Sequence, residues 1–65
     1  MNITINGNSE AGDFSHVADI LKKMDLDPKL VVVELNGNIV PKEDYASFPL
    51  HEGDIVEIVQ FVAGG

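Results

Sequence analysis

The sequence predicts an α+β domain in which one main helix lies across one face of a mixed β-sheet of four to five strands. Three observations lead to this fold class. Apolar and polar residues alternate near both ends of the chain, one segment between them has helical periodicity, and Asn-Gly pairs separate candidate strands. The 65 residues suffice for one small domain, 1–65, with a single core. Because the chain has no cysteine, we expect packing to stabilise that core without disulfides.

The first half of the chain predicts a hairpin followed by the helix. Ile3 and Ile5 alternate with polar residues in a strand, residues 6–8 form a turn, and residues 9–12 suggest a short returning edge strand. The helix is expected over residues 16–25, with Ser15 as its N-cap and Pro28 preventing it from running on. Its apolar stripe has the spacing i, i+3, i+4 and i+7, and consists of Val17, Ile20, Leu21 and Met24.

The second half predicts three more strands. In residues 30–35 the side chains of Val31, Val33 and Leu35 can face the helix, which leaves Val32 and Glu34 outside. Residues 36–37, Asn-Gly, predict a tight turn into a short return strand, and residues 42–45 a helical turn. The last strand covers residues 55–62. This order of elements is typical of a β-grasp fold, and we expect the first and last strands to pair at the centre of the sheet.

The last strand has two faces of different character. Val56 and Ile58 are assigned to the core, because Glu57 on the other face should not be buried without a partner. The other face then carries an apolar patch, predicted to dock a partner protein, that consists of Ile55, Val59 and Phe61. In an alternative interpretation, loops or the region around Phe48 cover this patch.

The composition favours a protein partner over other ligand classes. The formal net charge is −7, with 11 acidic residues against 4 lysines and no arginine. This balance argues against binding nucleic acid or an anionic membrane surface, and it suits a basic partner or simply confers solubility. The longest aliphatic run, residues 30–33, is too short to span a bilayer, and a cytoplasmic location is expected. His16 and His51 have no metal-ligand spacing, and no catalytic motif occurs, so we expect neither a metal site nor an enzyme.

The chain ends in a Gly-Gly tail, about residues 62–65. Gly64 and Gly65 lack a Cβ atom, so a narrow enzyme channel could enclose their backbone closely. The terminal carboxylate is ionised at neutral pH and is a poor electrophile until another enzyme converts it to an anhydride with AMP. Terminal glycines alone are weak evidence, since many chains end in small residues.

Three stretches, "VADILKKMDL", "VVVELNGNIVPKEDY" and "GDIVEIVQFVAGG", together resemble the ThiS-type sulfur carrier proteins of thiamine biosynthesis, which are ubiquitin-like β-grasp proteins. The most specific elements are Asn-Gly at 36–37 followed by "IVP", Gly-Asp at 53–54 and the terminal Ala-Gly-Gly. Two positions depart from the family: Lys42 and Tyr45 stand where it often has arginine and tryptophan. The resemblance implies a ubiquitin-like β-grasp fold and a carrier rather than a catalyst.

The same resemblance implies the chemistry of the tail. Gly65 would be the covalent site, adenylated by a ThiF-like enzyme that uses ATP and magnesium, while Gly64 and Ala63 thread into that enzyme. A persulfide donor, a cysteine desulfurase or a rhodanese-like protein, would then supply the sulfur of a thiocarboxylate. The sulfur would pass to a ThiG-like thiazole synthase, and the chain itself would bind no cofactor. The alternatives are sulfur delivery for tRNA thiolation or molybdopterin synthesis, a ubiquitin-like modifier, or an interaction module.

Overall fold

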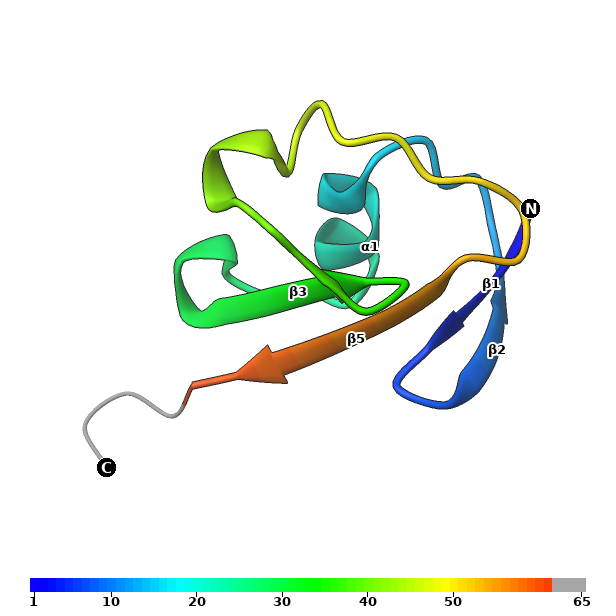
Figure 1. Ribbon diagram of the computed structural model, residues 1–65, viewed down its shortest axis with the longest axis horizontal. Helices are drawn as coiled ribbons and strands as arrows, with labels where there is room; N and C mark the ends of the chain where they lie inside the picture. The colour runs from blue at the N-terminus through cyan, green and yellow to red at the C-terminus, as the bar shows by residue number, and fades with distance from the viewer. Residues whose placement is uncertain (62–65) are drawn as a thin grey trace.

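The computed structural model describes residues 1–61, in which two β-hairpins flank a short α-helix and a fifth strand completes the sheet (Figure 1). The elements in chain order are β1 (Asn2–Ile5), β2 (Asn8–Ala11), α1 (Val17–Lys23), the 3₁₀ turn η1 (Pro28–Leu30), β3 (Val31–Leu35), β4 (Asn38–Val40), the 3₁₀ turn η2 (Lys42–Asp44) and β5 (Ile55–Gln60). The predicted edge strand, tight turns and helical turn are thus all present.

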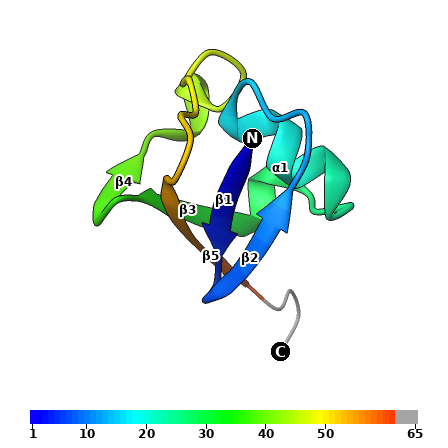
Figure 2. The same ribbon diagram turned by 90° about the vertical axis from the view of Figure 1, so that its right-hand side faces the viewer.

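The five strands form one mixed sheet in the order β2-β1-β5-β3-β4. β5 runs parallel to β1, with Thr4 opposite Ile55, and antiparallel to β3, with Val33 opposite Ile58. The last strand therefore lies between the two hairpins, while α1 covers one face of the sheet (Figure 2). The predicted central pairing of the first and last strands is confirmed.

Both hairpins turn through an Asn-Gly pair in the left-handed backbone region. The φ angles are 49° and 85° at Asn6 and Gly7, and 51° and 87° at Asn36 and Gly37. Two consecutive residues with positive φ define the turn whose twist matches that of the flanking strands. Asparagine and glycine tolerate this conformation better than other residues, so the sequence fixes both hairpin loops at two residues.

The predicted N-cap of the helix is wrong by one residue. His16, with extended backbone angles, is the N-cap, and α1 begins at Val17. The carboxylate of Asp19 accepts hydrogen bonds from the backbone amides of Ser15 (2.8 Å) and His16 (2.9 Å). These bonds, from His16 and then Ser15, lower the pKa of Asp19 below its ordinary value of 3.8. The Asp19 carboxylate thus bonds to the two residues that precede the helix, whereas the Ser15 hydroxyl was predicted to accept from an amide of the first turn.

The helix also ends earlier than predicted. Asp25 adopts a left-handed φ of 56°, and its amide donates to the Lys22 carbonyl at 3.2 Å. The Leu26 amide donates to the Leu21 carbonyl at 2.9 Å, which completes a Schellman motif. The turn away from the helix leaves Met24 41% exposed, so the apolar stripe ends at Leu21. The prediction that the stripe includes Met24 is therefore wrong.

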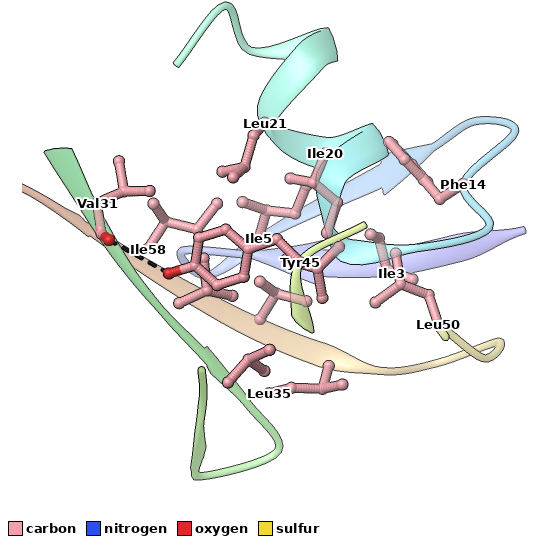
Figure 3. Packing of buried hydrophobic residues seen from close by; sticks show 14 residues of the cluster. Ile3, Ile5, Phe14, Ile20, Leu21, Val31, Leu35, Tyr45, Leu50 and Ile58 are labelled. Carbon is pink, nitrogen blue, oxygen red and sulfur yellow. Dashed lines mark hydrogen bonds between the residues drawn. The ribbon is translucent and has the colours of Figure 1, made fainter. Parts of the chain in front are cut away.

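The core lies between α1 and the sheet (Figure 3). The β3 and β5 residues that the alternation of apolar and polar side chains assigned to the core are all buried in it. The members of the core are Ile3, Ile5, Phe14, Val17, Ile20, Leu21, Val31, Val33, Leu35, Val40, Tyr45, Leu50, Val56 and Ile58. The hydroxyl group of buried Tyr45 donates a hydrogen bond to the Val31 carbonyl at 3.2 Å, so its one polar atom is satisfied (Figure 3).

Candidate functional site: the open sheet face and the end of β5

β5 presents its predicted docking residues to solvent. Val56 and Ile58 are buried on the helix side, whereas Ile55, Val59 and Phe61 are exposed by 54%, 54% and 53%. Phe48 packs against the core and does not cover them. The prediction of an exposed apolar patch is therefore confirmed, and the alternative of a covered patch is wrong. Its docking role stays a prediction.

The patch extends onto the neighbouring hairpin. Val32 lies opposite Val59 in the β3–β5 register, and Ile39 of β4 lies opposite Glu34. Ile39 is 69% exposed. Sequence reasoning missed it as a candidate, although the alternation that buries Val40 already implied that its neighbour points outward. We call the outward side chains of β3, β4 and β5, together with Phe61 directly after β5, the open face: Val32, Glu34, Ile39, Ile55, Glu57, Val59 and Phe61.

One asparagine side chain anchors the start of β5 to the second hairpin. The Asn36 side-chain oxygen accepts from the Ile55 amide at 2.9 Å, and its side-chain nitrogen donates to Asp54 at 3.0 Å. Asp54, only 9% exposed, also accepts from the His51 amide at 2.7 Å. The Asn36 backbone amide completes the connection by donating to the Ile55 carbonyl at 2.7 Å. The Asn-Gly and Gly-Asp motifs are thus two halves of one hydrogen-bonded structure.

A second asparagine holds the middle of β5. The side-chain oxygen of Asn6 accepts from the Ile58 amide at 2.7 Å, and its nitrogen donates to the Ile58 carbonyl at 3.3 Å. This amide continues the β1–β5 pairing beyond Ile5, the last residue of β1. Side chains from both hairpin turns therefore fix the strand that carries most of the open face.

The hydrogen-bonded ladder continues past β5 itself. The Phe61 amide donates to the Leu30 carbonyl at 2.7 Å, so the backbone is held through the last described residue. The predicted covalent site Gly65 and the predicted threading residues Gly64 and Ala63 lie outside the described residues. The structure thus defines the strand from which the tail starts and the surface beside it.

Other kinds of site receive no support from the described residues. Within residues 1–61, no three histidine or acidic side chains are grouped so that they could hold a metal ion. In the same part of the chain, none of the helical segments has the length and apolar character that crossing a bilayer requires.

The family model for ThiS matches residues 2–65. The chain belongs to the ThiS family. The sulfur carrier protein ThiS of Bacillus subtilis is 42% identical to it over 53 residues, which cover 82% of this chain and 80% of that protein. The thiamine biosynthesis protein (ThiS) of Geobacter metallireducens has a crystal structure that superimposes with a TM-score of 0.82, at 32% identity and full coverage of both chains. The predicted family and the predicted ubiquitin-like β-grasp fold are confirmed.

A thiazole synthase is also similar to this ThiS-family chain. The thiazole synthase of Paramagnetospirillum magneticum is 38% identical over 66 residues, which cover all of this chain and 20% of that protein. This chain thus spans about a fifth of the length of that relative.

The two positions that depart from the ThiS pattern both have structural roles. Lys42 donates from Nζ to the Lys29 carbonyl at 2.9 Å, which joins the two 3₁₀ turns. Tyr45 fills part of the core and bonds to Val31. Both replacements therefore lie on the helix side of the sheet, away from the open face.

Proposed function

We propose that this ThiS-family chain is a sulfur carrier protein of thiamine biosynthesis, with the carboxylate of Gly65 as its reacting group. The observation that carries the proposal is the family match over residues 2–65, which includes the Gly-Gly tail. The arrangement of β5 supports it, because the strand that leads to the tail is held by hydrogen bonds through Phe61. The chain acts as a carrier and not as a catalyst.

The proposed reaction begins with activation by a partner enzyme. The Gly65 carboxylate attacks the α-phosphorus of ATP, pyrophosphate leaves, and an acyl adenylate forms, with magnesium neutralising the phosphate charge. A persulfide sulfur then attacks the acyl carbon and AMP leaves. A thiol reduces the resulting sulfur–sulfur bond, which leaves a thiocarboxylate on Gly65. The chain has no cysteine, so no side-chain thiol of its own can carry the persulfide.

A thiazole synthase is the proposed recipient of the sulfur. In the Paramagnetospirillum relative, a segment similar to this whole chain is part of a protein named thiazole synthase. A carrier-like segment joined to its recipient has a high effective concentration, and a separate carrier must reach the same enzyme by docking. No observation favours tRNA thiolation, molybdopterin synthesis or protein modification.

Intact-mass measurement tests the proposal. The protein is incubated with its adenylating enzyme, magnesium, ATP, a persulfide donor and a thiol reductant. The expected product has one oxygen replaced by sulfur, located at Gly65 by fragmentation. The matched control lacks Gly65 and should show neither the mass change nor rescue of a thiamine auxotroph. A linkage to a lysine of another protein would contradict the proposal, as would full rescue by the Gly65 deletion.

A further inference from the structure

The chain contains two almost identical Asn-Gly turns. Their sequences are Ile-Asn-Gly-Asn at 5–8 and Leu-Asn-Gly-Asn at 35–38, and their φ angles are nearly equal. An asparagine that precedes glycine loses its side-chain amide more readily than other asparagines, because glycine has no Cβ atom to hinder the approach of its backbone amide. Each turn is therefore a candidate for this spontaneous modification, and each serves as a control for the other.

The Asn36-Gly37 turn presents its reacting groups to water. Asn36 and Gly37 are both exposed, and apart from chain neighbours no heavy atom lies within 4 Å of the point where a Cβ atom on Gly37 would stand. Among residues 1–61 the Gly37 amide has no hydrogen-bond acceptor, so it is free to attack. Asp54 and Ile55 hold the Asn36 side chain, so the side chain must swing away first and the reaction is slow in the folded protein.

The modification follows a balanced route. The Gly37 nitrogen attacks the side-chain carbonyl carbon of Asn36 and gives up its proton, and the side-chain nitrogen leaves with that proton as ammonia. Water then opens the resulting succinimide ring at either carbonyl group, which leaves aspartate or isoaspartate at position 36. One water is consumed and one ammonia is released, so the reaction needs neither an enzyme nor an oxidant.

The two turns differ in the acceptor that faces the side-chain nitrogen. Nδ2 of Asn36 donates to the Asp54 carboxylate at 3.0 Å, and Asp54 is only 9% exposed. Nδ2 of Asn6 donates to a neutral acceptor, the Ile58 carbonyl, at 3.3 Å. Loss of the amide at position 36 therefore sets a second carboxylate against Asp54. At position 6 it affects only the longer of two hydrogen bonds, because the 2.7 Å bond from the Ile58 amide needs an oxygen alone.

We infer that the Asn36-Gly37 turn is a deamidation-sensitive site, at which loss of one side-chain amide releases the start of β5. Two carboxylates within hydrogen-bond distance of each other repel, and the burial of Asp54 limits screening by water. Asp54 also accepts from the His51 amide, so the repulsion acts on the loop before β5 as well as on the second hairpin. This consequence concerns the fold and does not depend on the reaction proposed for Gly65.

The repulsion has a pH dependence of defined sign. Two adjacent carboxylates take up a shared proton at a higher pH than an isolated carboxyl group does, and that proton restores a hydrogen bond between them. The destabilisation is therefore complete at neutral pH and disappears as the pH falls toward about 4, the ordinary range of a carboxyl group. His51 is the other titratable side chain that lines the pocket beside Asn36 and Asp54, so it must be controlled for.

Variants that carry the product test this consequence. Asn36→Asp is compared with Asn6→Asp, which makes the same change in the matched turn. At pH 7 the melting temperature of Asn36→Asp should be about 10 °C or more below that of wild type, and Asn6→Asp should lose less than half as much. The deficit of Asn36→Asp should shrink by at least about half at pH 4, also when His51→Gln is present in both proteins. Equal losses in the two variants, or a deficit independent of pH, would overturn the inference.

Ageing of the wild-type chain tests the modification itself. The full chain is kept in mildly alkaline buffer, treated briefly with a protease that cleaves unfolded chains, and mapped by mass spectrometry of its peptides. A sample held in urea gives the reference rates, which should be similar for the two turns because their sequences are nearly identical. Chains modified at position 36 should be depleted from the protease-resistant fraction relative to chains modified at position 6. Absence of modification at position 36, or equal survival of both products, would overturn the inference.

Discussion

Replacement of Asn36 by alanine should destabilise the domain strongly, because it removes two hydrogen bonds and a favourable backbone preference together. The side chain bonds to the carboxylate of Asp54 and to the amide of Ile55. The residue also has a φ of 51°, which asparagine tolerates and alanine does not. Replacement by glycine is the matched control, because glycine loses the same two hydrogen bonds and adopts the positive φ freely.

The magnitude follows from these three contributions. The bond to the charged Asp54 carboxylate contributes about 1.5 kcal/mol, and the bond to Ile55 about 1 kcal/mol. The left-handed conformation costs alanine about 1 kcal/mol more. Asn36→Ala should therefore lower the free energy of unfolding by about 3–4 kcal/mol and Asn36→Gly by about 2–3 kcal/mol. A domain of this size has a total stability of roughly 3–10 kcal/mol, so the alanine variant approaches the limit of folding.

Urea unfolding followed by far-ultraviolet circular dichroism measures both variants. The midpoint should shift with an unchanged m value, and the melting temperature of Asn36→Ala should fall by about 15–25 °C. A loss below about 1 kcal/mol for alanine would refute the role given to the side chain. If glycine destabilises as much as alanine, the backbone part of the argument is wrong.

Three further predictions concern the core and the helix. Tyr45→Phe should cost about 1 kcal/mol in urea unfolding, because it removes only the bond to Val31; a loss above about 3 kcal/mol would contradict this. Val56→Ala should cost about 2–3 kcal/mol and the outward Val59→Ala on the same strand less than about 0.5 kcal/mol, and equal losses would refute the assignment of the two faces. Asp19→Ala should lower the melting temperature at pH 7. Because the pKa of Asp19 is lowered in the folded state, its ionised carboxylate stabilises that state fully above the unfolded pKa. This stabilisation is lost as the pH falls through the folded pKa. The difference between Asp19→Ala and wild type should therefore shrink below about pH 4, and a difference that is constant with pH would contradict the capping role.

The strand pattern was predictable because each strand of the core obeys alternation and each hairpin turn has its own local signal. Asn36 and Gly37 adopt positive φ angles, and Val33 and Val40 on either side of them pair as a two-residue loop requires. The helix ends were less predictable. Ser15 had the usual side chain for an N-cap, but the Asp19 carboxylate is a stronger acceptor and bonds to two amides. Asp25 then ends the helix in a conformation that glycine would usually signal.

The candidate site was predictable where it depended on one strand and not where it depended on two. The cost of burying Glu57 assigned the faces of β5 and so found Ile55, Val59 and Phe61. The position of Glu34 opposite Glu57 could not be found in the same way. β3 and β5 are separated by the second hairpin turn and the η2 segment, so no single loop sets their register.

The register of β5 connects these observations. Asn36 and Asn6 bond to the backbone at Ile55 and Ile58, so they fix which residues of β5 lie opposite β3. A shift by one residue would move Glu57 to the core side and Val56 to the open face. The two asparagines therefore act together with the strand pairing to place Glu57 opposite Glu34. It follows that Glu34 and Glu57 can change without loss of the fold, whereas the asparagines cannot.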